Sequence, residues 1–348
     1  MADQEGELQS LAEVKQLSVS ADRLLYSANH DEIKRGLTTD VYFIKTREVL
    51  KELDLGQQQV TAEVFASRAG VLAGVEEALN LLADKEVKVW GLAEGSNMEQ
   101  KEVVLRIEGS YNDFGIFETS ILGTLASSSG WATAAAECKE AAGEIPVLCF
   151  GARHIHPAVA PVMEKAAVIG GAAGASCILG AKLAGQEPSG TVPHALILLA
   201  GDTLKVAQTY HEIMPTEEPR IILVDTFKDE AEETLRLAAE LEESLDGVRL
   251  DTPSERGGVT PALVKEVRAR LDQAGYEEVN LFISGGITPE RISNLKELGV
   301  SGFGVGSYIS TAESINMTMD IKEIGGKPVA KRGRIPGITK NERLKRLI

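Results

Sequence analysis

Short apolar runs without polar alternation recur through the second half of the chain, and each ends in small or acidic residues. Continuous runs such as residues 221–224 are typical of strands buried on both faces, as parallel strands under helices are. Helical segments separate most of the runs, so the pattern predicts an α/β domain over residues 118–310, either a barrel or an open sheet. The runs are PVLCFGARH, HALILLAGD, RIILVDTF, VRLDTPS, VNLFISGG and GFGVGS.

The first part of the chain has a different pattern of apolar and polar residues. Residues 1–36 predict a polar arm followed by a helix, and the segment up to residue 117 completes the expected N-terminal α/β domain. Runs with β-branched residues, broken by Gly and charged turns, predict several strands there. These runs are TTDVYFIKTREVL, VTAEVFASRAG, VKVWGLAEG and KEVVLRIEG. From Glu118 a long helical region of small residues begins.

Two further segments carry patterns of their own. Residues 166–181 are mostly Ala and Gly and fall short of the roughly 20 residues that cross a bilayer, so we expect a closely packed helix there. Residues 311–348 are expected to form a C-terminal extension that returns to the N-terminal domain. Its basic tail, residues 331–348, holds seven Lys or Arg against one Glu, and we favour a solvated, mobile end over a phosphate-facing one.

Charge and composition narrow the possible functions. The 348 residues include 52 acidic and 36 basic side chains, a net charge of −16, so the average surface repels nucleic acids and anionic membranes. The acidic N-terminus lacks the basic-then-apolar order of an export signal. Three widely spaced cysteines, Cys138, Cys149 and Cys177, offer neither a disulfide framework nor a metal pair. We therefore expect a cytoplasmic protein that acts on small molecules.

The ends of the predicted strands are where an α/β barrel places its reactive groups. Here those ends carry Arg153, Asp202, Asp225, Asp251, Ser284 and Gly306. Two consecutive late strands end in glycine turns, ISGGIT at residues 283–288 and GFGVGS at residues 302–307. Without a Cβ, the backbone N–H groups of such turns can approach phosphate oxygens. We favour phosphate binding over the alternative that the glycines only form tight turns.

The segment FGARHIHP places an aromatic ring, a guanidinium and two imidazoles near a strand end. The ring of Phe150 can stack on a planar ligand, while Arg153 can hold a carboxylate in two parallel hydrogen bonds. A metal site at His154 and His156 is not expected, because the sequence identifies no third ligand.

Further candidates have structural as well as functional interpretations. Asp225 and Asp251 are suited to hold Mg²⁺, ribose hydroxyls or a developing positive charge, or else they cap the helices that follow. His194 is expected to open a strand, as a proton-transfer group, a nucleophile or a core histidine, and the residues alone favour the core. Tyr42 is most simply a half-buried packing residue.

Taken together, these motifs resemble the archaeal and bacterial branch of the nicotinate phosphoribosyltransferases over residues 30–330. The resemblance implies an irregular TIM-like α/β barrel with an N-terminal α/β domain. It also implies transfer of phosphoribosyl from phosphoribosyl pyrophosphate to nicotinate in NAD salvage, with Mg²⁺ on the pyrophosphate and ATP as a co-substrate. The segments that carry it are TTDVYF, YNDFGIFETSILG, FGARHIHPAVAP, IGGAAGASCILGAKLAG, VPHALILLAGD, LVDTF, RLDTPSERGG, ISGGIT and GFGVGS.

The resemblance implies roles for single residues as well. Phe150 and Tyr42 would sandwich the pyridine ring, and Arg153 would stand near its carboxylate. Tyr42 and Asp40 would come from the neighbouring subunit, which makes a homodimer the smallest working unit. His194 matches a histidine that ATP phosphorylates in relatives. The ribose and phosphates would meet Arg249, Asp251, Thr252 and Ser254, with Asp225 nearby, and the 5′-phosphate would meet Gly285, Gly286, Gly304 and Gly306.

Two features depart from the family pattern. Ala173 stands in GGAAG where close relatives read GGADG, so it replaces an Asp that can contact the pyridine or fix an Arg. The preference for nicotinate over nicotinamide or quinolinate is therefore left open. No cysteine follows Cys177, so the structural zinc module of some relatives is not expected.

Two alternatives to this activity are kept. The decarboxylating quinolinate phosphoribosyltransferases share the barrel, but a second carboxylate demands further cationic groups. The stretch near the ring offers only Arg153 with the weakly basic His154 and His156. A barrel without catalysis, used for ligand sensing or assembly, is less favoured because the candidate catalytic groups are all present.

Overall fold

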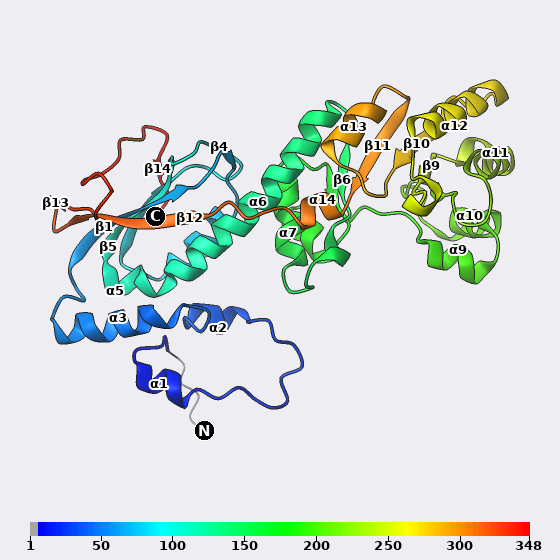
Figure 1. Ribbon diagram of the computed structural model, residues 1–348. Coiled ribbons are helices and arrows are strands. Elements are labelled where there is room, and N and C mark those ends of the chain that lie inside the picture. Colours follow the sequence, from blue (N-terminus) through cyan, green and yellow to red (C-terminus); the bar gives the residue numbers. More distant parts are fainter. Residues whose placement is uncertain (1–5) are drawn as a thin grey trace. The chain divides into compact units, whose positions relative to one another are not determined.

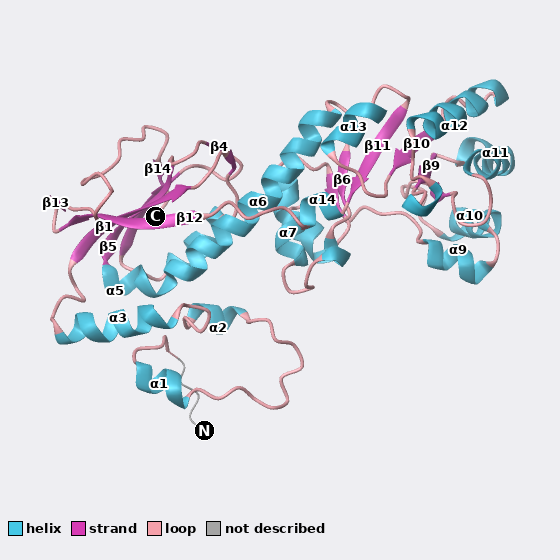
Figure 2. Cartoon of the chain, in the orientation of Figure 1, coloured by secondary structure: helices cyan, strands magenta, loops and turns pink. Residues whose placement is uncertain are grey.

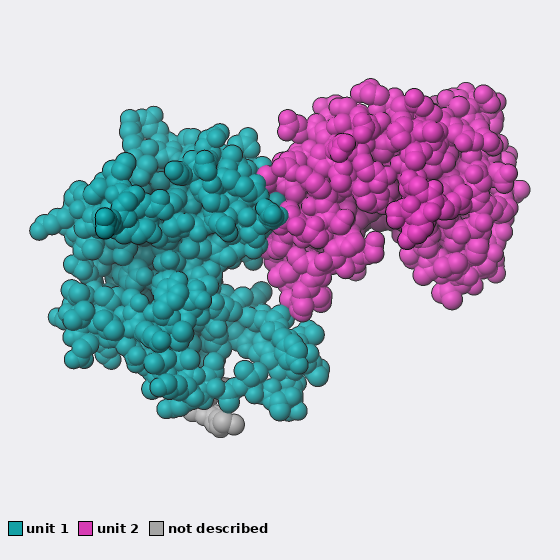
Figure 3. Space-filling model, viewed as in Figure 1, with its two compact units in different colours: residues 1–130, 313–348 teal, residues 131–312 magenta. Residues whose placement is uncertain are grey.

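The computed structural model describes residues 6–348, and the chain divides into two compact units. Unit 1 comprises residues 1–130 and 313–348, and unit 2 comprises residues 131–312 (Figure 3). The division falls inside the long helix α6, Glu118–Ala142. No helix in the described part of the chain has the length and apolar character needed to cross a membrane.

Unit 1 is built on a six-stranded antiparallel sheet with the order β13-β12-β1-β5-β3-β14 (Figure 1). The strands are β1 Gln59–Ala66, β3 Val87–Gly91, β5 Val103–Ser110, β12 Met317–Ile324, β13 Lys327–Pro328 and β14 Lys345–Arg346. A small two-stranded sheet joins β2 Gly70–Val71 to β4 Asn97–Met98. The runs VTAEVFASRAG, VKVWGLAEG and KEVVLRIEG thus form strands, as their β-branched content predicts.

Unit 1 also contains helices. They are α1 Leu11–Gln16, α2 His30–Lys34, α3 Val41–Glu52, α4 Val75–Leu82 and α5 Tyr111–Phe114, followed by the 3₁₀ turn Gly115–Phe117 and the first half of α6. Residues of α4, α5 and the first half of α6 share the apolar core with the sheet. Ile121 and Leu125 of α6 lie in the same core cluster as Val64 of β1 and Ile107 of β5. The unit therefore has one apolar core between sheet and helices.

The expectation of a strand within TTDVYFIKTREVL is wrong, because residues 41–52 form helix α3. Phe43 and Ile44 are its buried residues, and the guanidinium of Arg47 donates to the backbone oxygens of Leu8 and Asn112. A run of β-branched residues is a weak signal by itself, since strand preference depends on the neighbours against which the residues pack.

Unit 2 contains a six-stranded parallel sheet with the order β7-β6-β11-β10-β9-β8. The strands are β6 Val147–Cys149, β7 Gly174–Ala175, β8 Ile221–Leu223, β9 Gly247–Leu250, β10 Asn280–Ile283 and β11 Val300–Val305. The sheet is curled, with β7 and β8 at its edges, so it forms a half-barrel. The predicted fold class, a TIM-like α/β barrel with an N-terminal α/β domain, is confirmed in this partial form.

Helices alternate with these strands along the chain (Figure 2). They are α7 Ala160–Ile169, α8 Ile178–Leu183, α9 His194–Ala200, α10 Thr203–Ile213, α11 Glu230–Leu241, α12 Pro261–Ala274, α13 Pro289–Leu295 and α14 Ser307–Ser310. Three 3₁₀ turns, Ala152–His154, Glu242–Ser244 and Ser254–Arg256, complete the unit. The strand interiors are largely buried, which explains why their sequences lack polar alternation.

Two of the expected elements of unit 2 are different in the structure. The run HALILLAGD is helix α9, which ends at Gly201 in the left-handed conformation, and Asp202 caps α10 rather than ending a strand. The apolar stretch 166–181 is not one helix: α7 ends at Gly170, and β7 and the start of α8 follow. Gly171, with φ of +101°, provides the turn that a side chain would strain.

The basic tail is folded onto unit 1, so the expectation of a mobile end is wrong. Lys331 and Arg334 pair with the two carboxylate oxygens of the buried Asp320, at 2.6 Å and 2.9 Å. Strand β14 then extends the sheet alongside β3, and Ile348 packs against the core. Charge runs at termini are usually solvated, but here buried acidic side chains provide partners for the basic ones.

Candidate active site

A cavity of about 380 Å³ opens at the carboxyl-terminal ends of the unit 2 strands. The loops that follow β6, β9, β10 and β11 contribute to its lining, as expected for a parallel α/β sheet. Of the predicted site residues, the structure brings Phe150, Arg153, Arg249, Asp251, Gly285, Gly286, Gly304 and Gly306 into its wall. Residues from four separate strands thus meet around one space.

The turn after β10 is shaped by its two glycines. Gly285 and Gly286 have φ of +86° and +62°, which favour glycine. Arg291 holds the turn, because its Nη1 donates to the carbonyl oxygens of Gly285 at 2.7 Å and Gly286 at 3.0 Å. A Cβ on Gly285 would lie 2.9 Å from Oδ1 of Asp251, so glycine also lets this carboxylate approach the turn. Ser284 Oγ donates to the same carboxylate oxygen at 2.9 Å.

The glycines of the second turn make room for side chains of the β6 loop. A Cβ on Gly304 would lie 2.5 Å from the ring of Phe150, and one on Gly306 would lie 3.0 Å from Nε2 of His154. The first distance is one that a real Cβ does not reach, so Gly304 lets the ring lie against β11, and the second is tighter than most Cβ contacts, so Gly306 gives the imidazole room. Packing is therefore a second reason for these glycines, beside the expected phosphate contact.

A cluster of one histidine and two carboxylates lies beside this cavity. Nε2 of His194, the first residue of α9, is 3.7 Å from Oδ2 of Asp225 and 3.6 Å from Oδ2 of Asp251. Its Nδ1 lies 3.1 Å from Thr226 Oγ1, which fixes the ring. The side chain of Asp225 is 1% exposed, and within the described residues neither of its oxygens has a hydrogen-bond partner. Burial raises the pKa of Asp225, although His194 opposes that shift.

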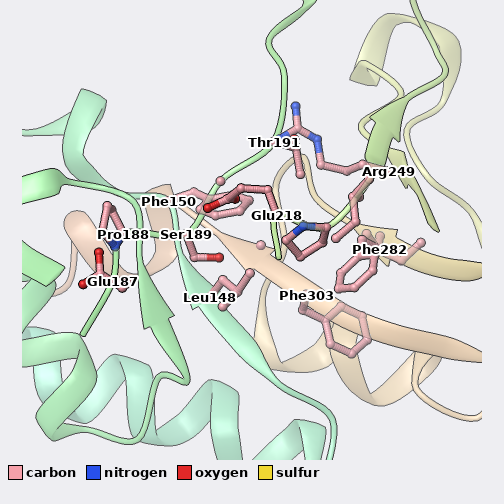
Figure 4. Close-up of a pocket in the computed structure, with 15 residues that line it drawn as sticks. Leu148, Phe150, Glu187, Pro188, Ser189, Thr191, Glu218, Arg249, Phe282 and Phe303 are labelled. Carbon is pink, nitrogen blue, oxygen red and sulfur yellow. The ribbon is translucent and has the colours of Figure 1, made fainter. Parts of the chain in front are cut away.

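Arg249 of β9 lies between the cavity and a smaller neighbour. The smaller cavity, of about 250 Å³, is lined by apolar side chains such as Phe282 and Phe303 and by polar ones such as Glu187 and Glu218 (Figure 4). Nε of Arg249 is buried and lacks a hydrogen-bond partner among the described residues. Burial lowers the pKa of this guanidinium, while Asp251 and Asp225 oppose the shift. An unpaired donor of this kind fits an anionic ligand group such as a carboxylate or phosphate.

Four of the predicted site residues lie elsewhere. Thr252 is buried and its Oγ1 donates to Oε1 of Glu230 at 2.7 Å, while Ser254 Oγ donates to Glu255, so neither hydroxyl lines the cavity. In unit 1, Asp40 accepts a hydrogen bond from Thr119 Oγ1 at 3.2 Å. The side chain of Tyr42 follows it on α3 and is 54% exposed.

Three lining residues lie outside the glycine turns and the FGARHIHP segment, and the sequence did not single them out: Ser176, Gly190 and Thr191. Ser176 follows the short strand β7, which lies inside the stretch expected to be one helix. A two-residue strand leaves no periodic signal. The other two belong to the connection between α8 and α9, where no predicted element ends.

Two family models match the chain over most of its length. The model for the quinolinate phosphoribosyl transferase N-terminal domain matches residues 40–129, and the one for the C-terminal domain of the same enzymes matches residues 131–320. The fold and the two matching models thus define a phosphoribosyltransferase with an N-terminal α/β domain and a half-barrel. The chain belongs to the quinolinate phosphoribosyl transferase family.

Solved structures share the fold of this chain. Nicotinate-nucleotide pyrophosphorylase from Pyrococcus furiosus is 45% identical, with a TM-score of 0.87; the match covers 91% of this chain and 82% of that one. Human nicotinic acid phosphoribosyltransferase, at 20% identity and a TM-score of 0.68, covers 86% of this chain and 77% of its own, and shares the fold.

Curated relatives are more distant. Nicotinate phosphoribosyltransferase pncB2 of Mycobacterium tuberculosis is 30% identical over 232 residues, which are 65% of this chain and 48% of that protein. Its paralogue pncB1 is 26% identical over 339 residues, covering 85% of this chain and 74% of that protein. The chain thus spans about half the length of the first of these relatives.

The comparisons correct the activity expected from the sequence. The assignment to the nicotinate phosphoribosyltransferases, with nicotinate as acceptor and ATP as co-substrate, is wrong, because both domain models are those of quinolinate phosphoribosyl transferases. The phosphohistidine role of His194 is withdrawn with it. Several of the motifs that carried the resemblance lie at strand ends around the cavity, where both kinds of enzyme are expected to bind the same phosphoribosyl donor, so they do not distinguish the acceptor.

Proposed function

We propose that this protein is a quinolinate phosphoribosyltransferase. It would transfer phosphoribosyl from phosphoribosyl pyrophosphate to the ring nitrogen of quinolinate, with loss of CO₂, giving nicotinate mononucleotide and pyrophosphate for NAD synthesis. Membership of the family supports this proposal. The observation that carries it is the unpartnered Nε of Arg249 on the wall of the same cavity as Arg153.

Two carboxylates on one small ring require several cationic groups. Near the expected ring site, the sequence offered only Arg153 and its neighbouring histidines. So few cationic groups argued against an acceptor with two carboxylates. In the structure, Arg249 joins Arg153 and His154 around the cavity from a distant strand. Two guanidinium groups can pair with two carboxylates, and the ring of Phe150 provides a flat apolar surface beside them.

Phosphoribosyl pyrophosphate, the donor of the phosphoribosyl group, would occupy the side of the cavity that the glycine turns form. Backbone N–H groups around Gly285 and Gly286 suit the 5′-phosphate, and Mg²⁺ would arrive bound to the pyrophosphate of the substrate. As the bond from the anomeric carbon to pyrophosphate breaks, positive charge develops on the ribose. The carboxylates of Asp251 and Asp225 are the groups available to stabilise that charge.

Transfer and decarboxylation balance without a further reactant. The ring nitrogen of quinolinate donates its electron pair to the anomeric carbon, pyrophosphate leaves with the electrons of the broken bond, and the ring nitrogen becomes cationic. The carboxylate on the adjacent carbon then leaves as CO₂. The electron pair of the broken C–C bond stays on that carbon, where the neighbouring positive nitrogen stabilises it. A proton from solvent then bonds to the carbon in place of the carboxylate.

We also propose a homodimer in which Asp40 and Tyr42 reach the partner's cavity. The exposure of Tyr42, 54% in the single chain, supports a role outside its own core. The described cysteines Cys138, Cys149 and Cys177 are all free, which supports a reducing compartment such as the cytoplasm.

A product assay tests the proposed function. Purified protein is incubated with Mg²⁺, phosphoribosyl pyrophosphate and either quinolinate or nicotinate, with and without ATP. We expect nicotinate mononucleotide and CO₂ from quinolinate, at a rate that ATP does not change. Turnover of nicotinate in place of quinolinate, or a requirement for ATP, would contradict the proposal.

A further inference from the structure

One carboxylate outside the cavity joins two of the loops that form its wall. Glu164 lies in the middle of α7 and is 0% exposed. Its Oε1 accepts hydrogen bonds from the backbone N–H of Ala152 at 3.2 Å and from Ser176 Oγ at 3.0 Å. Its Oε2 accepts from the backbone N–H of Cys177. The three donors belong to the loops that follow β6 and β7.

These loops carry residues that face the ligand space. Ala152 and Arg153 are consecutive residues of one 3₁₀ turn, and both line the cavity, as does Ser176. Glu164 does not line it. The carboxylate therefore lies behind the wall, where it can fix the distance between the Arg153 loop and the Ser176 loop without touching a ligand.

The position of Glu164 is itself tightly defined. A Cβ on Gly180 of α8 would lie 3.0 Å from the Cβ of Glu164, so the two helices approach closely at this point. Burying a carboxylate is costly unless donors replace its water, and here the three hydrogen bonds do so. An apolar residue would fill the space but would leave two backbone N–H groups without this acceptor.

We propose that Glu164 is a positioning residue, which holds the Arg153 loop and the Ser176 loop at the spacing that recognises a carboxylate of the acceptor. This inference rests on the proposed function for the identity of the acceptor. The loop-linking role itself follows from the hydrogen bonds alone. Glu164 should therefore affect binding of the pyridine acid far more than binding of phosphoribosyl pyrophosphate, whose phosphates face the glycine turns.

The test compares two buried glutamates of unit 2. Glu164→Gln keeps the shape but turns one acceptor oxygen into an NH₂ donor, which then opposes an N–H or O–H donor. The matched control is Glu233→Gln on α11, where Glu233 is buried and pairs with Arg236 at 3.1 Å, away from the cavity. Both variants lose a buried charged contact, so both should unfold at lower temperature than the wild type.

The two variants should differ in kinetics. For Glu164→Gln we expect the KM for quinolinate to rise at least about tenfold, the size expected when a hydrogen bond to a charged group is lost. The KM for phosphoribosyl pyrophosphate should stay within about twofold of wild type, as should both constants of Glu233→Gln. Equal rises in both KM values of Glu164→Gln, or unchanged values, would overturn the inference. If that variant does not fold, Ser176→Ala removes one of the three bonds and should raise only the acceptor KM, by a smaller factor.

Hydrogen exchange provides a reading that needs no activity. Amides of residues 151–154 and 176–178 should exchange faster in Glu164→Gln than in wild type and remain unchanged in Glu233→Gln. Unchanged exchange in both variants would refute the loop-linking role. An inactive wild type with the expected exchange pattern would refute the proposed function and leave Glu164 as the link between the loops.

Discussion

The imidazole Nε2 of His194 lies 3.6 Å from the carboxylate oxygen Oδ2 of Asp251, although 56 residues of sequence separate the two. Asp251 and Asp225 lie at one edge of the sheet because each follows a parallel strand, and the connection between α8 and α9 brings His194, the first residue of α9, to the same place. The buried carboxylate of Asp225, after β8, lies 3.7 Å from the same imidazole nitrogen.

Asp225→Asn should remove activity while making the fold more stable. Burial raises the pKa of Asp225 above that of an exposed aspartate, so the folded state resists its ionisation. Stability contributed by this group therefore falls as pH rises from the ordinary aspartate pKa through the raised one, and an uncharged Asn avoids that loss. Activity should fall about 100-fold or more if the carboxylate stabilises the ribose cation.

Thermal unfolding between pH 3 and pH 8 and steady-state rates measure the two effects. Asp229→Asn is the control, since Asp229 caps α11 and Asn caps helices as well as Asp does. The control should keep wild-type rate and stability. An Asp225→Asn variant that is both active and less stable would show that the carboxylate has a structural role.

Gly285→Ala should distort the glycine turn that is proposed to bind phosphoribosyl pyrophosphate. The φ of +86° strains any side chain, and the new Cβ would meet Oδ1 of Asp251 at 2.9 Å. Gly275→Ala is a matched control, because its φ of +84° is nearly the same and nothing lies within 4 Å of an added Cβ. Both variants should lose about 1 kcal/mol of unfolding free energy. Only Gly285→Ala should raise the KM for phosphoribosyl pyrophosphate, by about tenfold in initial-rate assays.

Much of the half-barrel follows from the sequence. Strands β8 to β11 are buried on both faces, so their runs lack alternation, and the residues after them are polar where the sheet edge opens. Asp251 and Gly285 could be placed at one edge for that reason. The same argument failed for α9, because a short apolar run such as ALILLA fits a strand and a helix equally well.

Other parts of the site depend on contacts that no local pattern shows. Glu164 is a single acidic residue within an apolar helix, and its hydrogen-bond donors lie 12 and 13 residues away in two different loops. Arg249 was expected on the ribose and phosphate path, and it lines both cavities, the larger one together with Arg153. No local pattern assigned it to the acceptor beside Arg153, so an acceptor with two carboxylates was less favoured.

Gly304→Ala tests whether the Phe150 ring orients the acceptor. The new Cβ would lie 2.5 Å from ring carbons of Phe150 and displace the ring into the cavity. Gly302→Ala, two residues earlier in β11, creates a similar overlap with Phe282 at 2.6 Å, and Phe282 lines only the smaller cavity of the two. Overpacking of this kind costs about 1–3 kcal/mol in either variant.

Initial rates measured over a range of quinolinate concentrations separate the two variants. The KM for quinolinate should rise about tenfold or more in Gly304→Ala, since the displaced ring costs the bound acceptor its stacking surface. Gly302→Ala should lower the unfolding temperature to a similar extent and leave this KM near the wild-type value. Equal effects on KM would mean that general loosening of β11, and not the Phe150 ring, controls acceptor binding.

Mixed dimers test whether Tyr42 acts in the partner's cavity. Tyr42 lies in unit 1 and His194 in unit 2, and Tyr42→Ala and His194→Ala should each remove most activity without changing the dimer. If unit 1 of one subunit completes unit 2 of the other, a dimer of one chain of each variant has one intact site and one doubly altered site. Subunit exchange in equal amounts should then restore about a quarter of wild-type activity, because about half the dimers are mixed and half of their sites are intact. If each chain instead completes its own site, every site in the mixture carries one substitution and activity stays at the level of the separate variants.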